Sequence, residues 1–350
     1  IQDNTWFMKY LIFRTDHIGD FLITLPLIKC IKRNNINSEI IVVASPKNQK
    51  FVKNNKLVDD IFVLKSNKFL DKLSLLLELK KHSYEAIIVS DKKNRSIIIS
   101  LFLKAKKKIF NVSKKLQKEV LKTFYKSIFL DNDKQQNFSM KEIIEKNCLS
   151  LDIKLINEDY NFFSKNQFKD YFQIDHNLKL ENSKYIVFHY DEKWELDNYS
   201  KLFKKAKNLS NIDVDKDNFM KFLTKLSEKL STKIIITTGY INTDIINSLK
   251  TVSKKINNSL YELSASNKNI YMIINQDFYS LSHLISKSNL FISCHGAFTH
   301  IASCYNVRIL DIIEEEKKIH YSKITSHMKN YKTLYRKEAS KLLEEIIGNS

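Results

Sequence analysis

Short apolar segments typical of buried strands alternate with helix-like segments along most of this chain of 350 residues. In the first half, the expected strands are Met8–Thr15, Glu39–Ala44, Val58–Leu64, Tyr84–Ser90 and Lys108–Val112. Between them we expect helices over Phe21–Lys32, Lys68–Lys81 and Ser96–Lys104, and a short helix opened by Pro46. Such alternation is typical of βαβ units, in which helices cover both faces of a parallel sheet. The first half is therefore predicted to be an α/β domain.

The alternation resumes in the second half after a less regular stretch, 113–182, that contains one predicted helix over Ser139–Leu149. The expected strands are Tyr185–Tyr190, Lys233–Thr238, Asn269–Asn275, Leu290–Ser293 and Arg308–Ile313, and the expected helices are Asn218–Leu230, Thr243–Lys255, Leu281–Ser288 and Ala297–Cys304. We predict two Rossmann-like domains, 1–178 and 179–330, with parallel sheets facing an interdomain cleft. A last amphipathic segment within 331–350 is expected to pack back on the first domain.

Charge and composition narrow the class of partner. The net charge is +19, and the excess is mostly Lys spread along the chain. This distribution favours a solvated Lys-rich surface or an anionic membrane surface over nucleic acid, because no basic stripe is interleaved with aromatic residues. The four cysteines form no CxxC pair, which favours a reducing, cytoplasmic setting and gives no metal-ligand spacing. No uncharged apolar run reaches 18 residues, so neither a membrane span nor a secretory signal is expected.

Glycine is scarce in this chain, and its placement points to ligand sites. There are four glycines, where average usage would give about 25. Gly19, Gly239 and Gly296 each follow a predicted strand, at the edge where α/β sheets bind ligands. We expect them where the backbone turns sharply or approaches a ligand closely.

The loop around Gly19 carries the first candidate site. It contains Arg14, Asp16, His17 and Asp20, with Asp20 at the start of the helix that follows. Asp20 can serve as a general base facing the cleft, or simply cap the helix, and Asp16 is the rival carboxylate. Arg14 can bind an anion as a fork or pair with a neighbouring carboxylate. The loop matches neither the dinucleotide fingerprint nor the P-loop, so no bound cofactor is indicated.

The second candidate site surrounds Gly296. A strand ends before it and a helix begins after it, which is a setting suited to a diphosphate. His295, Thr299 and His300 can add donors there, although lone histidines are more often structural. Gly239 and Lys193 follow other strands of the same half, and Lys193 can reach a phosphate as a point charge. The His and Cys spacing does not indicate a metal site.

Together these motifs resemble glycosyltransferase family 9, which contains the ADP-heptose:lipopolysaccharide heptosyltransferases. The resemblance rests on Arg-x-Asp-x-Ile-Gly-Asp-x-x-x-Thr-Leu-Pro from Arg14, Lys193-Trp194, the turn at Gly239, and Gly-x-x-x-His-x-Ala from Gly296. It implies a GT-B fold and metal-independent, inverting transfer of a sugar from a nucleotide donor, such as an ADP-linked heptose. It also implies that Asp20 is the base, that Lys193 contacts donor phosphate, and that Gly296 and His300 border the donor.

The implied acceptor is a lipopolysaccharide core or another surface glycan, lipid-linked or an oligosaccharide, used by a cytoplasmic enzyme peripheral to the membrane. The chain has Cys294-His295-Gly296 where this family usually has Asp-Thr-Gly, which leaves the donor sugar open. Two alternatives therefore remain. One is another GT-B enzyme, such as a nucleotide-sugar epimerase or a phosphorylase, and the other is a catalytically silent binding or scaffold protein.

Overall fold

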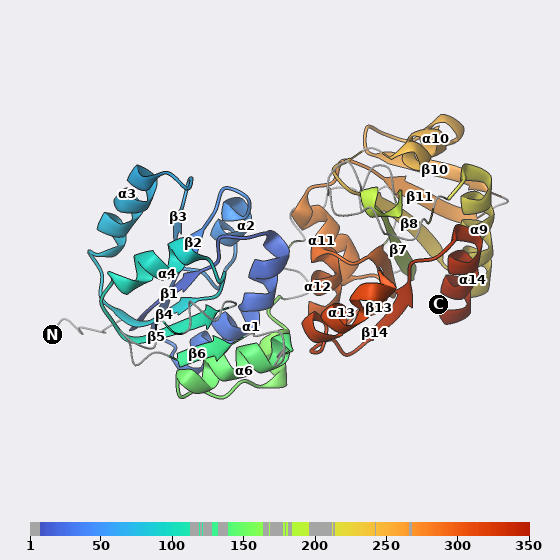
Figure 1. Cartoon of the computed structure of the whole chain (residues 1–350). Coiled ribbons are helices and arrows are strands. Elements are labelled where there is room, and N and C mark those ends of the chain that lie inside the picture. Colours follow the sequence, from blue (N-terminus) through green and yellow to red (C-terminus); the bar gives the residue numbers. More distant parts are fainter. Residues whose placement is uncertain are drawn as a thin grey trace. The chain divides into compact units, whose positions relative to one another are not determined.

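The computed structural model describes residues 8–112, 139–163, 184–195, 214–241, 243–265 and 268–350, with 119, 121, 128–131, 168, 178, 180 and 212. The chain divides into two compact units (Figure 1). The first runs to Phe162 and includes Ser322–His327, and the second comprises Phe163–Tyr321 and Met328–Ser350. Most of 164–183 lies outside the described residues, so the boundary at 178/179 stays a prediction.

A six-stranded parallel sheet forms the centre of the first unit, in the order β3-β2-β1-β4-β5-β6. Its strands are β1 (Met8–Phe13), β2 (Ser38–Ala44), β3 (Asp60–Val63), β4 (Tyr84–Val89), β5 (Ala105–Val112) and β6 (Ile128–Asp131). Alternate residues of the central strands, such as Leu11 and Phe13, join one buried core, as the two-residue period of a strand requires. The predicted parallel α/β architecture of this half is confirmed.

The helices of the first unit connect these strands, and their positions follow the predicted ones to within a few residues. They are α1 (Ile18–Asn34), α2 (Gln49–Lys53), α3 (Phe69–Leu79), α4 (Asn94–Leu101) and α6 (Met140–Ser150), with a 3₁₀ turn η1 (Asn157–Tyr160). The turn η1 is held to α1 by Arg33, whose guanidinium donates to both oxygens of the fully buried Asp159 carboxylate at 3.0 Å. Helix α4 ends before the predicted Lys104 because β5 begins at Ala105.

An eight-stranded sheet in the order β14-β13-β12-β7-β8-β11-β10-β9 forms the second unit. Its strands are β7 (Tyr185–Tyr190), β8 (Lys233–Thr238), β9 (Lys254–Lys255), β10 (Leu260–Ala265), β11 (Lys268–Ile273), β12 (Leu290–Cys294), β13 (Arg308–Ile313) and β14 (Tyr331–Tyr335). Strands β14 to β11 are parallel, but β10 pairs antiparallel with both β11 and β9. The predicted parallel pairing is confirmed for strands β14 to β11, and β10 and β9 add an antiparallel edge that was not predicted.

Helices cover the second sheet around an aromatic core. They are α9 (Lys216–Leu230), α10 (Asp244–Val252), α11 (Phe278–Ser286), α12 (Ala297–Cys304), α13 (Lys318–Ile324) and α14 (Ala339–Asn349), with 3₁₀ turns η3 (Glu192–Trp194) and η5 (Glu315–Lys317). Trp194 is fully buried against Phe188 and Tyr190, and its indole nitrogen donates to the His189 carbonyl at 3.0 Å. The core role predicted as the default for Trp194 is confirmed. Helix α10 stops at Val252 rather than at the predicted Lys255, because Lys254–Lys255 enters the sheet as β9.

The C-terminal segment belongs to the second unit. Leu342, Leu343 and Ile346 of α14 are buried in the second unit's core, and α14 packs on α9 and β14 (Figure 1). The expectation that 331–350 packs on the first domain is wrong. The reason is that β14 adds to the sheet beside β13, and the short connection after Tyr335 returns α14 to the same sheet. Among the residues described, no helix is both long and apolar enough to cross a bilayer.

Candidate functional site

The loop after β1 leads directly into α1, which begins at Ile18 with His17 as its N-cap residue. Gly19 therefore lies in the first helical turn, and no glycine of the chain has a positive φ. The expectation that Gly19 permits a sharp turn is wrong, since the turn is made by Asp16 and His17 before the helix starts. His17 is exposed there.

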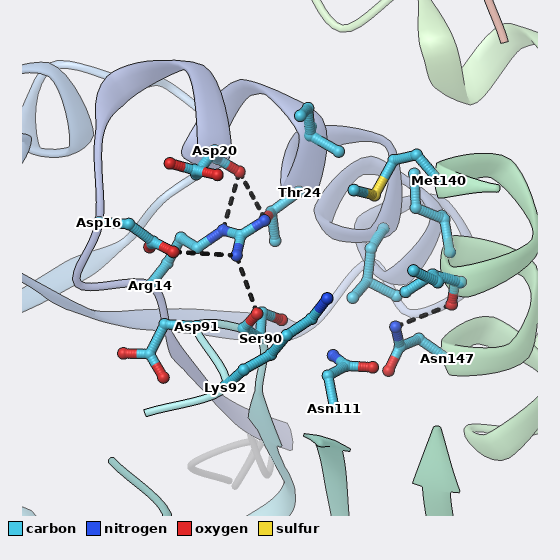
Figure 2. A pocket seen from close by; sticks show the side chains of 14 residues that line it. Arg14, Asp16, Asp20, Thr24, Ser90, Asp91, Lys92, Asn111, Met140 and Asn147 are labelled. Atoms are coloured by element: carbon cyan, nitrogen blue, oxygen red, sulfur yellow. Dashed lines mark hydrogen bonds and ion pairs between the residues drawn. The ribbon is translucent and has the colours of Figure 1, made fainter. Parts of the chain in front are cut away.

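Asp20 occupies the third position of α1 and is one of the residues that line a pocket at the carboxyl edge of the first sheet (Figure 2). Its carboxylate accepts a hydrogen bond from the His17 N–H at 3.2 Å, which is the geometry of a helix cap. The same side chain lines a pocket with about 600 Å³ of empty space. The capping role is confirmed, and the second carboxylate oxygen leaves room for a further partner.

Arg14 lines this pocket and links the backbone segments around it. Its guanidinium donates to the carbonyls of Asp20 and Ser90, each at 2.8 Å, and its Nη1 lies 3.4 Å from an Asp16 oxygen. The side chain is buried, so it holds the end of β1, the start of α1 and the end of β4 in one geometry. Of the two predicted roles for Arg14, pairing with a neighbouring carboxylate is confirmed.

Asp16 is the second carboxylate of the pocket. Burial raises the pKa of Asp16, and the positive charge of Arg14 opposes part of that effect. Its Oδ1 atom is buried and accepts no hydrogen bond from the described residues. A carboxylate with an unsatisfied oxygen beside a pocket is a candidate ligand contact, because an unpaired buried oxygen costs about 1–3 kcal/mol.

Lys92 is a pocket residue that the sequence analysis missed. It follows β4 in a left-handed conformation with φ 57°, and its side chain extends toward the centre of the pocket (Figure 2). Burial lowers the pKa of Lys92, and the nearby Arg14 charge lowers it further. A lysine held in a strained backbone conformation costs roughly 1–3 kcal/mol, and such residues cluster at functional sites. The sequence did indicate Lys92, because it follows the end of a predicted strand just as Asp16 does.

In the second unit, the loop after β7 places Lys193 against the turn before α12. The Lys193 ammonium donates to Asp191 Oδ2 at 2.9 Å and to the His295 carbonyl at 3.0 Å. A Cβ atom on Gly296 would lie 2.9 Å from the Lys193 Nζ, so the glycine leaves the space that the ammonium occupies. Burial opposes the charge, but Asp191 raises the pKa of Lys193 above its ordinary value, and the ammonium stays charged.

Gly239 lies beside the same loop. A Cβ atom there would meet Glu192 Oε2 at 2.8 Å and the Asp191 Cβ at 3.0 Å. The sequence analysis assigned Lys193, Gly239, His295 and Gly296 to one site. The structure places Lys193 against His295 and Gly296, and places Gly239 beside the loop that carries Lys193. At both glycine positions an added Cβ atom would meet neighbouring atoms, so the site requires a residue without a side chain. Neither glycine has a positive φ.

His295 is held by a buried carboxylate on the neighbouring strand. Its Nδ1 lies 2.6 Å from Asp311 Oδ2, and the Tyr331 hydroxyl donates to that oxygen at 2.8 Å. Thr299 is fully buried, and its hydroxyl accepts from the Gly296 N–H and donates to Asp311 Oδ1. The expectation that Thr299 offers a donor to a ligand is wrong, because Asp311 takes that hydrogen bond. Asp311 is a second residue that the sequence analysis missed.

His300 lies one turn further along α12. It is buried, and its ring packs edge-on against His295 at 5.4 Å between ring centres. Its predicted contact with a donor stays a prediction. Across the described ranges, no group of three or more His, Cys, Asp or Glu side chains is arranged to hold a metal ion.

Known proteins resemble this chain in sequence and in fold. No family model matches the chain. It is 24% identical to lipopolysaccharide heptosyltransferase 1 of Campylobacter coli, over 98% of this chain and 100% of that protein. The predicted resemblance to glycosyltransferase family 9 is confirmed.

Solved structures agree on the fold. The E. coli heptosyltransferase WaaC with ADP-2-deoxy-2-fluoro heptose has a TM-score of 0.65 at 12% identity, covering 98% of this chain and 100% of WaaC. The family 9 glycosyl transferase of Veillonella parvula has a TM-score of 0.62 at 13% identity, covering 98% of each chain. A UDP-GlcNAc 2-epimerase from Methanocaldococcus jannaschii is more distant, with a TM-score of 0.52 at 13% identity over 97% of this chain and 92% of the epimerase. The GT-B fold of two Rossmann-like domains is thus confirmed.

The close approach of Lys193 to Gly296 leads to a first prediction. Gly296→Ala should push the Lys193 ammonium away from Asp191 and the His295 carbonyl, and the weakened ion pair with the buried Asp191 should lower stability. If the Lys193 ammonium contacts donor phosphate, as the family resemblance implies, this displacement should also weaken ADP binding by about tenfold or more. Isothermal titration with ADP measures the change. Gly348→Ala, where a Cβ meets nothing within 4 Å, is the matched control.

The buried imidazoles give a second prediction. Burial lowers the pKa of His189 to about 4, and that of His327 to about 4 as well. Between pH 6.5 and 4 the unfolded chain binds protons that the folded chain does not, so stability should fall as the pH is lowered through this window. Each group can contribute up to about 1.4 kcal/mol per pH unit.

Urea unfolding at several pH values between 7.5 and 4.5 tests this coupling. The slope of unfolding free energy against pH should be smaller in His189→Gln than in the wild type, once each is referred to its own value at pH 7.5. An unchanged slope would mean that His189 is not a source of the acid sensitivity.

Proposed function

We propose that this protein is an inverting, metal-independent glycosyltransferase that moves a heptose or a related sugar from a nucleotide-sugar donor to a lipopolysaccharide-core or other surface-glycan acceptor. The observation that carries the proposal is the full-length likeness to lipopolysaccharide heptosyltransferase 1. The carboxylate-lined pocket at the end of β1 supports it, because acid–base chemistry needs such a group at a ligand-binding edge.

Asp20 is the proposed general base. Its carboxylate accepts a proton from the acceptor hydroxyl as that oxygen attacks the anomeric carbon from the face opposite the nucleotide. The bond from the anomeric carbon to the donor phosphate breaks, and its electron pair leaves with the nucleoside diphosphate. Asp20 is favoured over Asp16 because Arg14 Nη1 already lies 3.4 Å from an Asp16 oxygen, whereas Asp20 uses one oxygen in the helix cap and has the other for a proton.

The second unit is the proposed donor site. The diphosphate gathers negative charge as it leaves, and the Lys193 ammonium together with the N–H groups at the start of α12 would stabilise it. Among the side chains there, His295 is the proposed second donor, with Asp311 fixing the orientation of its ring. In this scheme the chain needs no bound cofactor, because the nucleotide sugar is itself the substrate.

The proposed donor is an ADP-linked sugar. The solved WaaC structure that resembles this chain contains an ADP-heptose analogue, which is the direct reason for that choice. The proposed acceptor is a lipid-linked glycan or oligosaccharide. The protein would work in the cytoplasm, on the inner face of the membrane, and the proposal includes no nucleic-acid partner.

A nucleotide-sugar epimerase is the second candidate. The likeness in fold to a UDP-GlcNAc 2-epimerase is the observation that favours it. An epimerase converts the nucleotide sugar without an acceptor, whereas a transferase releases free nucleoside diphosphate only as sugar reaches the acceptor. A binding protein would do neither.

A substitution at Asp20 tests the base. Asp20→Asn keeps an oxygen that can accept from the His17 N–H, so stability should change by less than about 1 kcal/mol. Loss of the base should lower the rate of sugar transfer by about 10²–10⁴-fold. The matched variant is Asp16→Asn. A larger loss of kcat in Asp16→Asn than in Asp20→Asn would exchange their proposed roles.

A thermal-shift panel tests the donor. ADP-, UDP-, GDP- and CMP-linked sugars are compared at equal concentration, and the ADP-linked sugar should raise Tm most. A ligand at about 100 times its Kd stabilises the fold by about 2.7 kcal/mol. A shift only with UDP-linked sugars would favour the epimerase, and no shift with any donor would favour a scaffold.

A further inference from the structure

Helix α3 carries apolar side chains on two faces, although folding needs only one. Leu75 and Leu79 are buried in the core of the first unit. On the outer face, Phe69 and Leu70 are each 74% exposed, Leu77 is 57% exposed and Leu73 is 38% exposed. Leu70, Leu73 and Leu77 follow the three- and four-residue spacing that places side chains on one side of a helix. Nothing in the core of the unit requires this second apolar face.

Helix α4 extends the apolar surface. It packs beside α3 and contributes the exposed Ile98, with Phe102 just after its last turn (Figure 1). These two side chains are 55% and 61% exposed. We refer to Phe69, Leu70, Leu73, Leu77, Ile98 and Phe102 as the α3–α4 patch. Large exposed apolar side chains gathered on two neighbouring helices are typical of an interaction site.

The segment that carries the patch is rich in basic residues. Residues 65–108 contain twelve Lys and Arg against four Asp and Glu, although Lys106 and Lys107 on β5 pair with Glu85 and Asp152. One of these lysines, Lys80, places its ammonium 6.0 Å from the centre of the Phe102 ring. A surface with apolar side chains surrounded by lysines is complementary to an anionic lipid bilayer, in which acyl chains lie beneath negatively charged headgroups.

A cationic hollow adjoins the patch. It is lined by Lys72, Lys92, Lys93 and Arg95, with Asn67 and Ile98. Ile98 belongs to both the hollow and the patch, so the two surfaces are continuous. Lys92 also lines the pocket that contains Asp16 and Asp20. The hollow therefore lies between the apolar patch and the candidate active-site pocket.

We propose that the α3–α4 patch docks on an anionic lipid bilayer, and that the cationic hollow receives lipid headgroup phosphates. The apolar side chains would enter the boundary between headgroups and acyl chains. This deepens the proposed function, on which it rests for the lipid-linked acceptor, because Lys92 would connect the bilayer surface to the Asp20 pocket. A second copy of the chain is the less favourable occupant, since two such basic surfaces repel.

Vesicle co-sedimentation of the full chain tests this proposal. The wild type should bind phosphatidylglycerol-rich vesicles, and binding should weaken with added salt. The triple variant Leu70→Ser, Leu77→Ser, Phe102→Ser should bind the vesicles at least about tenfold more weakly. Each change removes an apolar side chain that would contact the lipid acyl chains. The control triple variant changes Ile36, Leu149 and Val252 to Ser, which are exposed apolar residues elsewhere in the chain, and should bind as the wild type does.

Several outcomes would overturn the proposal. They are equal vesicle binding by the two triple variants, equal binding to pure phosphatidylcholine vesicles, or no binding by the wild type. A wild-type dimer in sedimentation analysis that the patch variant makes monomeric would assign the patch to a second copy. Competition by inorganic phosphate that abolishes binding would assign the hollow to a free anion. Thermal unfolding of the patch variant, with and without ADP, separates these results from misfolding and from failure of the donor proposal.

Discussion

Burial of the central parallel strands on both faces is the constraint from which the rest of the structure follows. Ile12 in β1 and Ile88 in β4 have no exposed surface, and their neighbours along each strand are equally buried. Polar side chains are disfavoured along such strands, because burying a polar group without a hydrogen-bond partner costs free energy of folding. Polar side chains therefore gather where the strands end. Arg14 lies at this point and links three backbone segments, so the pocket geometry depends on its hydrogen bonds.

In the second unit, polar side chains also gather where the buried strands end, but the residues are different. Cys294 stands where the resembled family usually has an acidic residue, and burial raises the pKa of its thiol, so it carries no charge. A carboxylate is nevertheless present, because Asp311 on the adjacent strand holds His295. The negative charge beside His295 therefore comes from the neighbouring strand and not from the residue before it in the turn.

Periodicity predicted the two α/β halves well, because buried strands and amphipathic helices leave local patterns. The edge strands β9 and β10 were not predicted, because Lys254–Lys255 was included in the preceding helix and no strand was expected over Leu260–Ala265. Helix α14 was placed on the wrong domain because its apolar face fits any sheet, and only the pairing of β14 with β13 decides which one.

The candidate site was predictable where it follows strand ends in the sequence. Asp20, Lys193 and Gly296 were found in that way. Lys92 also follows a strand end and was overlooked, whereas Asp311 lies within a strand and its role depends on His295 and Thr299 of the neighbouring segment. Thr299 was wrongly predicted to donate to a ligand, because the sequence does not show that Asp311 accepts its hydrogen bond.

Arg336, just beyond β14, donates to the backbone carbonyl of Lys193 and approaches the Cys294 thiol. The residue comes late in the chain, yet it fastens the loop that presents the ammonium to the turn before α12. Arg336 therefore couples the C-terminal segment, which completes the second core through α14, to the loop that carries Lys193. A change in that segment would disturb the position of the Lys193 ammonium as well as the packing of the core.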